Sequence, residues 1–218
     1  MEYPIYPHID TLWKRSEAGK IVVGEFTCPE FEYLQNLDWV GTEKVDGTNI
    51  RICVGPADDR ELGLRGRGDN ANLPGRIVEW FEKEIVPQSE RFWEQFSDGA
   101  VLYGEGYGAG IQKAGKLYLP DRVGFVLFDI RVGDWWLKRE DVVEIGQHFG
   151  LDVVPGAGVR PLMDHVRTVA AGFLSYWGNF PAEGLVIQPL VPLASRNGGR
   201  IITKIKTVDY RTEGRESK

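Results

Sequence analysis

Hydrophobic and polar residues follow two different periods along this chain, and each period predicts one type of element. Between residues 50 and 54 every second residue is apolar, which is the period of a strand with one buried face. Over residues 76–84 the bulky residues lie three and four positions apart, which predicts a helix that Pro87 interrupts. The runs at 100–103 and 123–130 are apolar throughout, which favours strands buried on both faces.

The second half of the chain mixes the same two patterns. Residues 138–150 predict a helix closed by a glycine, and a further helix is expected within 161–177. Strands are expected at 184–188 and 200–206. Because strands and helices interleave irregularly and glycines mark hairpin turns, we expect an α+β fold of antiparallel sheets flanked by helices, not a doubly wound parallel sheet. No repeat or linker divides the chain, so one domain over residues 1–218 is predicted.

Composition and charge narrow the class of protein. The 218 residues are 42% hydrophobic and 27% charged, which excludes a disordered, collagen-like or coiled-coil protein. The net charge of −6 excludes a uniformly basic nucleic-acid coat. Residues 195–218, however, hold seven basic and three acidic residues, or +4, so the rest of the chain carries −10. A chain polarised in this way can meet a polyanion at one end.

Cysteine content and the N-terminal sequence indicate the cellular compartment of the protein. With only Cys28 and Cys53 and no CxxC pair, free thiols in a reducing compartment are expected, and a disulfide between the two is the alternative. The first residues lack a basic stretch followed by an apolar run, and no apolar segment is long enough to span a bilayer. We therefore expect a cytoplasmic protein without a membrane segment.

Several segments resemble familiar motifs but lack a residue or a spacing that those motifs require. Residues 110–117 come close to a P-loop, but Leu117 replaces the Ser or Thr whose hydroxyl would bind Mg²⁺. The glycines between residues 104 and 110 miss the dinucleotide fingerprint, which leaves tight turns or close backbone approach as their role. The histidines lack the spacing of metal ligands, so surface or capping positions are expected for His8, His148 and His165.

A lysine between two carboxylates is the first candidate for chemistry. In the segment at 43–49, Lys44 stands ahead of the turn at Gly47 and the strand that follows it. A lysine ammonium has an ordinary pKa of about 10.4 and must lose its proton before it can attack phosphorus. Burial or neighbouring cations would favour that loss.

A pair of lysines near the C-terminus could supply such cations. An extended strand places Lys204 and Lys206 on one face with Ile202, roughly 7 Å apart at their Cα atoms, and residues 201, 203 and 205 on the other. Two ammonium groups in this arrangement suit a phosphate. Taken alone, however, the pattern favours a solvated strand edge over a phosphate site.

Six short segments, taken in their order along the chain, together resemble a known set of motifs. The six segments, in sequence order, are Lys44-Val-Asp-Gly47, Arg65-Gly-Arg-Gly68, Tyr103-Gly-Glu105-Gly-Tyr-Gly108, Phe125-Val-Leu-Phe128-Asp-Ile130, Glu183-Gly-Leu-Val-Ile187 and Lys204-Ile-Lys206. This series resembles the six ordered motifs of covalent nucleotidyltransferases, the superfamily of ATP-dependent DNA and RNA ligases and mRNA capping enzymes. The stretch Gly110-Ile-Gln-Lys113 makes the chain most similar to the RNA ligase 2 type family of phage and RNA-editing ligases.

The resemblance implies a ligase adenylation domain and a three-step reaction. Lys44 would attack the α-phosphorus of ATP, expel pyrophosphate and keep AMP on its side-chain nitrogen. The AMP would pass to a 5′-phosphate, and a 3′-hydroxyl would then displace it and seal the strand. In such ligases the residue matching Glu105 holds the ribose and the one matching Phe128 stacks on the base. Glu183 would lie near the nucleophile and a Mg²⁺ or Mn²⁺ ion, and the pair Lys204 and Lys206 would contact the phosphates.

The resemblance gives other residues less specific roles. Arg65 matches the arginine expected after the first strand, with Arg67 as the alternative. Asn49 matches an asparagine of the family, which implies a phosphate or strand contact. For Glu43, an adenine-edge contact and simple solvation at a strand end stay equally open.

One departure from the family concerns the C-terminus. Family ligases usually carry a further C-terminal domain, whereas only residues 207–218 follow the last motif, so neither an OB-fold nor another C-terminal domain is expected. A partner chain could supply one. The lead interpretation is an ATP-dependent ligase that acts on nucleic acid, with RNA preferred. The alternatives are a DNA ligase or a capping guanylyltransferase of the same fold, or a non-catalytic adenylate- or RNA-binding subunit.

Overall fold

The computed structural model describes residues 3–211, which form two compact units. The first unit consists of the residues through Pro7 together with Asp46–Val154. The second consists of His8–Val45 together with the residues from Pro155 onward. The chain therefore passes from one unit to the other inside the predicted nucleophile motif. The prediction of one nucleotidyltransferase domain over 1–218 stays a prediction.

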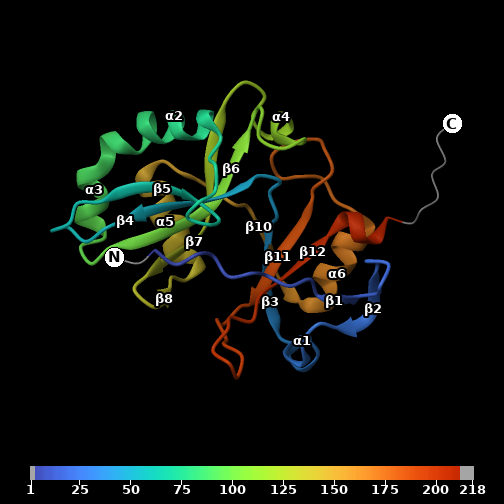
Figure 1. Ribbon diagram of the computed structural model, residues 1–218. Coiled ribbons are helices and arrows are strands. Elements are labelled where there is room, and N and C mark those ends of the chain that lie inside the picture. The colour runs from blue at the N-terminus through green and yellow to red at the C-terminus, as the bar shows by residue number, and fades with distance from the viewer. Residues whose placement is uncertain (1–2, 212–218) are drawn as a thin grey trace. The chain divides into compact units, whose positions relative to one another are not determined.

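The first unit is built on a six-stranded sheet (Figure 1). Its strands, in spatial order, are β5 (Leu62–Gly66), β4 (Thr48–Val54), β6 (Ala100–Gly108), β7 (Val123–Val132) and β8 (Trp135–Trp136), with β9 (Asp152–Val153) beside β7. All pairs are antiparallel except the short pairing of β9 with β7. The long apolar runs predicted as strands form its centre.

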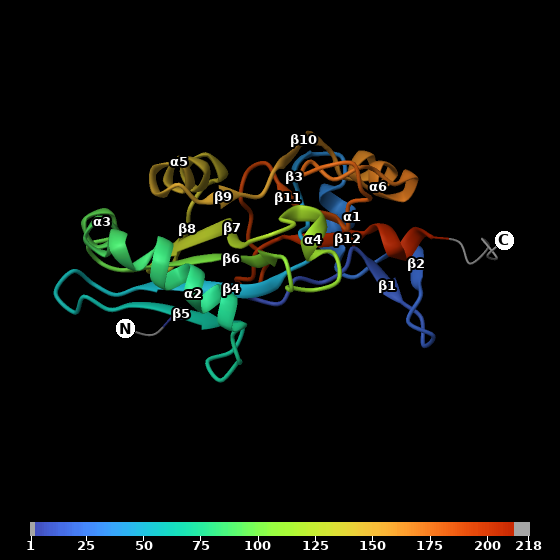
Figure 2. The same ribbon diagram turned by 90° about the horizontal axis from the view of Figure 1, so that it is seen from above.

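Helices cover one face of this sheet. They are α2 (Gly75–Glu84), the 3-10 turn η1 (Val86–Gln88), α3 (Ser89–Gln95) and α5 (Arg139–Phe149), while the short α4 (Gly115–Tyr118) follows β6 (Figure 2). Ile77 of α2, Phe92 of α3 and Phe149 of α5 share one core with Ile50 and Phe125 of the strands. As predicted, α5 ends at a glycine, Gly150, in the left-handed conformation.

The second unit contains a four-stranded antiparallel sheet and a hairpin. The sheet order is β10 (Gly156–Pro161), β3 (Asp38–Glu43), β11 (Gly184–Pro189) and β12 (Thr203–Lys206), and the hairpin consists of β1 (Trp13–Arg15) and β2 (Ile21–Phe26). Three further elements complete the unit, namely α1 (Pro29–Leu34), α6 (Leu162–Ala171) and the 3-10 turn η2 (Thr207–Tyr210). Trp39, Leu185 and Ile205 of the sheet pack with Leu162 and Val166 of α6. The predicted α+β fold of antiparallel sheets is confirmed.

Two predicted elements are shorter than expected. The helix predicted within 161–177 is α6, which ends at Ala171 because Gly172 takes a positive φ of 78°. The strand predicted from residue 200 begins only at Thr203. Before it, a turn in which the N–H of Ser195 donates to the carbonyl of Gly199 at 2.7 Å reverses the chain.

The half-buried strand predicted at residues 50–54 is wrong in one respect, because β4 is buried on both faces there. Arg51 and Cys53, the positions expected to face solvent, are each 0% exposed. Cys53 and Cys28 are free thiols in the part of the chain that the structure describes, as expected. Burial raises the pKa of the Cys53 thiol to about 12.

The basic C-terminal end is described in part. Arg196 and Arg211 are exposed, whereas Arg215 and Lys218 lie outside the described residues. Among residues 3–211, no helix combines the length and the apolar character that crossing a bilayer requires.

One of the three histidines is not at the surface. His8 and His148 are exposed as predicted, but His165 is completely buried between α6 and β3. Its Nε2 lies 2.9 Å from the carbonyl oxygen of Trp39. Gly41 makes room for the ring, since a Cβ at this position would lie 2.7 Å from Cε1 of His165. The surface or capping position expected for His165 was wrong, because the residue lies inside α6 and faces a glycine of β3 that leaves space for its ring.

This burial predicts a pH dependence of stability. Burial lowers the pKa of His165 below its ordinary value of 6.5, so the unfolded state binds more protons below that pH and stability falls as the pH falls through it. We expect His165→Gln to reduce the slope of unfolding free energy against pH below 6.5 by up to about 1.4 kcal/mol per pH unit. Chemical denaturation between pH 5 and 8 measures this slope.

The matched control is His148→Gln, which changes an exposed histidine. Equal slopes for His165→Gln and the unmodified protein would show that His165 is protonated in the folded state.

Candidate active site

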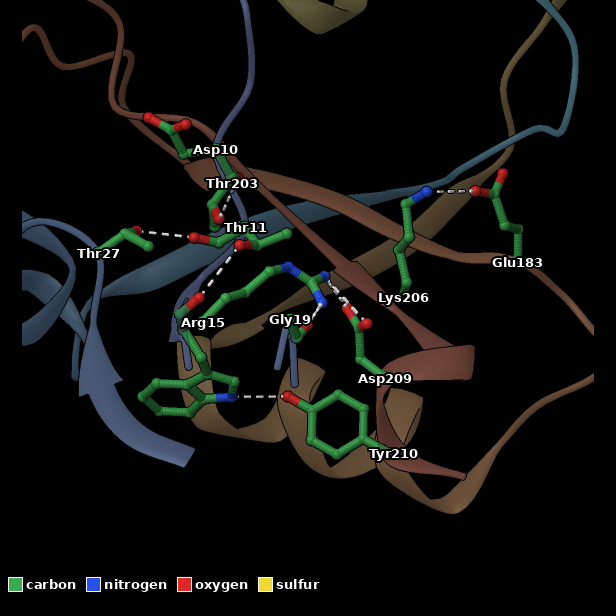
Figure 3. Close-up of polar contacts among 11 residues, drawn as sticks. Asp10, Thr11, Arg15, Gly19, Thr27, Glu183, Thr203, Lys206, Asp209 and Tyr210 are labelled. Atoms are coloured by element: carbon green, nitrogen blue, oxygen red, sulfur yellow. Dashed lines mark hydrogen bonds and ion pairs between the residues drawn. The ribbon is translucent and has the colours of Figure 1, made fainter. Parts of the chain in front are cut away.

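Lys44 and Glu183 meet at the end of the sheet in the second unit. Lys44 directly follows β3, and its backbone N–H donates to the carbonyl of Gly184 at 2.9 Å, which ties it to the start of β11. Its Nζ lies 2.7 Å from Oε2 of Glu183. The other oxygen of the same carboxylate lies 3.2 Å from Nζ of Lys206. Figure 3 shows this second contact, in which Lys206 points toward Glu183. One half-buried carboxylate thus holds two ammonium groups.

The strand register brings these residues together. In the antiparallel pairing of β11 and β12, Lys206 lies opposite Gly184, and Lys204 lies opposite Val186. Residues 201, 203 and 205 are buried, whereas the two lysines are half-buried on the other face, so the predicted alternation is confirmed. Gly184 has a φ of 155°, and a Cβ there would lie 2.0 Å from the carbonyl oxygen of Ile205. Only glycine therefore allows the two strands to approach this closely beside Glu183.

Glu43 points into the unit instead of along the lysine face. Its side chain is 1% exposed, and Oε2 accepts a hydrogen bond from the backbone N–H of Tyr176 at 2.8 Å. Burial raises the pKa of this carboxyl above its ordinary range, against the effect of its hydrogen bonds from Ser175 and Tyr176. Within residues 3–211, Oε1 of Glu43 is buried without a hydrogen-bond partner. Solvation at a strand end, one of the two roles considered for Glu43, does not fit this burial.

In the first unit, the remaining predicted residues share the sheet face opposite the helices. Asn49 of β4 lies directly opposite Glu105 of β6 in register. The turn before β4 packs closely against β6 beside Glu105. A Cβ on Gly47 would lie 2.6 Å from the carbonyl oxygen of Gly106 and 2.9 Å from Cβ of Glu105. The glycine that ends the nucleophile motif thus permits contact with the strand that carries Glu105. Among residues 3–211, Oδ1 of Asn49 is buried and lacks a hydrogen-bond partner.

A β-bulge places Phe128 on this face. Along β7 the register passes from Leu127, paired with Gly104, to Asp129, paired with Tyr103, so that Phe128 is the extra residue. A bulge re-aims the side chains around it, which simple alternation along the strand cannot predict. The ring of Phe128 meets Tyr6 edge-on, with 4.9 Å between ring centroids.

The two candidate arginines differ in setting. Arg65 lies in β5 opposite Arg51, its guanidinium stacks over the ring of Tyr3 at 4.8 Å, and it pairs with Glu61 at 3.1 Å. Arg67 is exposed beyond the end of β5. The assignment of Arg65 as the motif arginine stays a prediction.

Sequence reasoning assigned no role to Arg51. It is 0% exposed, and its guanidinium donates to the carbonyl oxygens of Gly66 at 2.9 Å and Tyr3 at 2.5 Å and to Asp69 at 2.8 Å. Arg51 therefore fastens the N-terminal segment to the sheet of the first unit. An arginine within an alternating strand gives no signal of burial, because its acceptors come from distant parts of the chain.

Tyr118 of α4 is a second residue that the sequence did not single out. Its hydroxyl accepts a hydrogen bond from the backbone N–H of Asp46 at 3.3 Å. It thus contacts the turn that leads from the nucleophile motif into β4.

The residues around Glu183 can be tested for a fit to a divalent metal ion. In the part of the chain that the structure describes, no three His, Cys, Asp or Glu side chains gather in a way that could hold a metal by themselves. Mg²⁺ commonly takes one or two carboxylates and completes its shell with phosphate oxygens and water. A single carboxylate such as Glu183 fits that mode of binding, in which the nucleotide supplies most of the ligands.

The second unit thus pairs a lysine that follows one strand with a glutamate that precedes a later strand of the same sheet. Residues 37–206 match the profile of the RNA ligase family. The chain therefore belongs to the RNA ligase family, and the resemblance drawn from its six motifs is confirmed. No curated protein matches the chain.

Solved structures show the same fold. Three structures of an RNA ligase from Naegleria gruberi each align with a TM-score of 0.64. A variant without ligand is 19% identical over 95% of this chain, a variant with ATP and Mn is 20% identical over 94%, and the ligase with pyrophosphate is 21% identical over 94%. This chain spans 62% of the length of each of those chains.

The buried guanidinium of Arg51 leads to a stability prediction. We expect Arg51→Met to lower the free energy of unfolding by about 3 kcal/mol, because it leaves the buried carbonyl groups of Gly66 and Tyr3 without their donor. Chemical denaturation provides the measurement.

Arg60→Met is the matched control in the same unit, since the Arg60–Glu90 pair is exposed and its loss should cost less than about 1 kcal/mol. Equal losses for the two variants would contradict the role given to Arg51.

Proposed function

We propose that this chain is the catalytic domain of an ATP-dependent RNA ligase that forms a covalent lysyl-AMP at Lys44. The single observation that carries the proposal is the cluster in which Glu183 holds both Lys44 and Lys206. Fold maintenance does not require two ammonium groups around one carboxylate at the end of a sheet. Membership of the RNA ligase family and the fold shared with the Naegleria ligase support the same reaction.

In the first step, the Lys44 amine attacks the α-phosphorus of ATP after it has lost a proton. A nitrogen–phosphorus bond forms, the bond from the α-phosphorus to the bridging oxygen breaks, and pyrophosphate leaves with the electron pair. Lys204 and Lys206 neutralise the charge on the phosphate oxygens, which is the main contribution a protein makes to transfer at phosphorus. The attacking nitrogen gives up its second proton to water as it becomes the phosphoramidate that carries AMP.

The same site then completes the ligation. A 5′-phosphate oxygen of the RNA attacks the phosphorus of lysyl-AMP and displaces Lys44. A 3′-hydroxyl next attacks the activated 5′-phosphate, so that AMP leaves and a phosphodiester forms. A bound Mg²⁺ or Mn²⁺, held by Glu183 and the phosphates, would supply further charge neutralisation.

Other residues of the proposal bind the nucleotide and the RNA. Glu105 would hold the ribose and Phe128 would stack on the base. Both lie on one sheet face with Asn49 and Arg65, which are proposed to contact the RNA. Glu43 would accept a hydrogen bond from the adenine edge, a contact that requires its side chain, which is 1% exposed, to turn out of the core.

Three further parts of the proposal concern the setting of the reaction. The chain spans 62% of the length of its structural relatives, and a partner chain that contributes to RNA binding is part of the proposal. The location proposed for the reaction is the cytoplasm. RNA is preferred to DNA as the substrate because the matched family is that of RNA ligases.

The nucleophile can be tested directly. We expect the purified protein, incubated with α-labelled ATP and Mg²⁺, to carry label through a denaturing gel, and Lys44→Ala to carry none while remaining folded. A labelled Lys44→Ala variant would contradict the assignment of the nucleophile.

The same assay separates the alternatives. A Lys44-dependent adduct with GTP but not with ATP indicates a capping guanylyltransferase. Transfer of AMP only to DNA ends indicates a DNA ligase. A folded protein that binds ATP without forming an adduct indicates a non-catalytic adenylate-binding subunit.

The phosphate role of Lys206 leads to a separate prediction. We expect Lys206→Ala to slow adduct formation by about a hundredfold, because it removes a charge at the reacting phosphates. Arg215→Ala removes a charge of the same sign from the basic end and should change the rate by less than about twofold. Single-turnover kinetics measure both, and equal losses would mean that only the total charge matters.

A further inference from the structure

The N-terminal segment covers the edge of the strand that carries the two lysines. In the order of the sheet, β12 is the last strand, so its outer edge is open to another segment. The backbone N–H of Lys204 donates to the carbonyl of Asp10 at 3.1 Å, and its carbonyl accepts from the N–H of Leu12 at 3.3 Å. The hydroxyl of Thr203 also donates to Asp10 at 2.9 Å. Residues 10–12 thus act as a short extra strand beside β12.

The β1–β2 hairpin that follows also holds the turn after Lys206. Arg15 donates to both carboxylate oxygens of Asp209 in η2, at 2.9 and 2.8 Å (Figure 3). Trp13, which is 2% exposed, donates its indole N–H to the hydroxyl of Tyr210 at 2.7 Å. We call these two contacts, Arg15–Asp209 and Trp13–Tyr210, the hairpin clamp.

The geometry of Arg15 is fixed from its own side as well. Its second guanidinium nitrogen donates to the carbonyl of Gly19, in the turn of the same hairpin, at 2.7 Å. One guanidinium nitrogen donates to both oxygens of Asp209, which is 13% exposed against 37% for Arg15, so the pair is less accessible to water than a fully exposed ion pair. The hairpin therefore presents a preorganised guanidinium to η2.

The clamp lies next to the functional cluster along the chain. The turn η2 begins directly after Lys206, and its first residue, Thr207, donates its N–H to the carbonyl of Glu183 at 2.8 Å. The hydroxyl of Thr207 donates to the carbonyl of Ala182 at 3.1 Å. A displacement of η2 would move both the backbone of Lys206 and the segment that carries its partner carboxylate.

We infer that Arg15 and Trp13 are positioning residues for Lys206, and that through the hairpin clamp they set its ammonium group for phosphate binding. This inference rests on the proposed function, because it concerns the phosphate ligand of that site. It gives a role in phosphate binding to Trp13 and Arg15, which lie outside the six motifs.

Binding of inorganic pyrophosphate to the full chain tests the inference without any turnover. We expect Arg15→Ala to weaken pyrophosphate binding by about tenfold, the scale of one lost charge-assisted hydrogen bond to the phosphate. In a Lys206→Ala background the same substitution should have no further effect. The matched control is Lys14→Ala, which removes a cation from the same hairpin where it pairs with the exposed Glu25.

Three results would overturn the inference. They are an equal loss in Lys14→Ala, a further tenfold loss in the Lys206→Ala background, and no pyrophosphate binding by the unmodified protein. Restored binding in the doubly reversed variant, Arg15→Asp with Asp209→Arg, would support it, and thermal unfolding of each variant separates misfolding from mispositioning.

Failure of the proposed function gives a different signature. If the unmodified protein binds pyrophosphate and responds to Arg15→Ala as expected but forms no adduct with ATP, the positioning role stands and the ligase reaction fails.

Discussion

The carboxylate of Glu183 is the interaction on which the arrangement of the second unit depends. Two ammonium groups that bind the same carboxylate repel each other, so the negative charge shared between Lys44 and Lys206 stabilises their approach. Glu183 supplies one oxygen to each. This contact joins the ends of three strands, because Lys44 follows β3, Glu183 precedes β11 and Lys206 ends β12. In the proposed reaction, the phosphates of the nucleotide would bring negative charge of their own and take over the ammonium partners of this carboxylate.

In the first unit, the sheet face opposite the helices carries polar and aromatic side chains, several of which are buried. Arg51 is satisfied there by backbone carbonyls and Asp69, and Tyr103 donates to the carbonyl of Pro4 at 2.9 Å. The N-terminal residues thus cover part of the face with their own hydrogen-bonding groups. The bulge at Phe128 allows one aromatic ring to leave the regular alternation of β7.

The sequence predicted those features that depend on local period or local geometry. The alternation around Lys204 and Lys206, the glycine end of α5 and the apolar strands β6 and β7 each follow from neighbours within a few positions. The ordered motifs identified the family because they span most of the chain. Recognising these motifs does not depend on knowing which side chains contact one another in the fold.

Several features that the sequence missed depend on partners far along the chain. Arg51 is buried because its acceptors come from Tyr3 and Asp69, and His165 because a glycine in another element leaves space for it. Arg15 and Asp209 are 194 positions apart, and no pattern near either residue points to the other. Long-range hydrogen bonding of this kind is set by the whole fold, whereas a local period reports only which side of an element is apolar.

The hairpin clamp has a consequence for how the limits of this domain are drawn. The part of the chain that matches the RNA ligase profile begins at residue 37 and ends at residue 206, so both halves of the clamp fall outside it. A shortened chain cut at those limits would keep every recognised motif and lose the residues that pair with β12 and its following turn. The exposed edge of β12 would then offer unpaired backbone groups to other chains, which favours aggregation. Similarity in sequence therefore marks a smaller unit here than the one whose contacts cover the edge of β12.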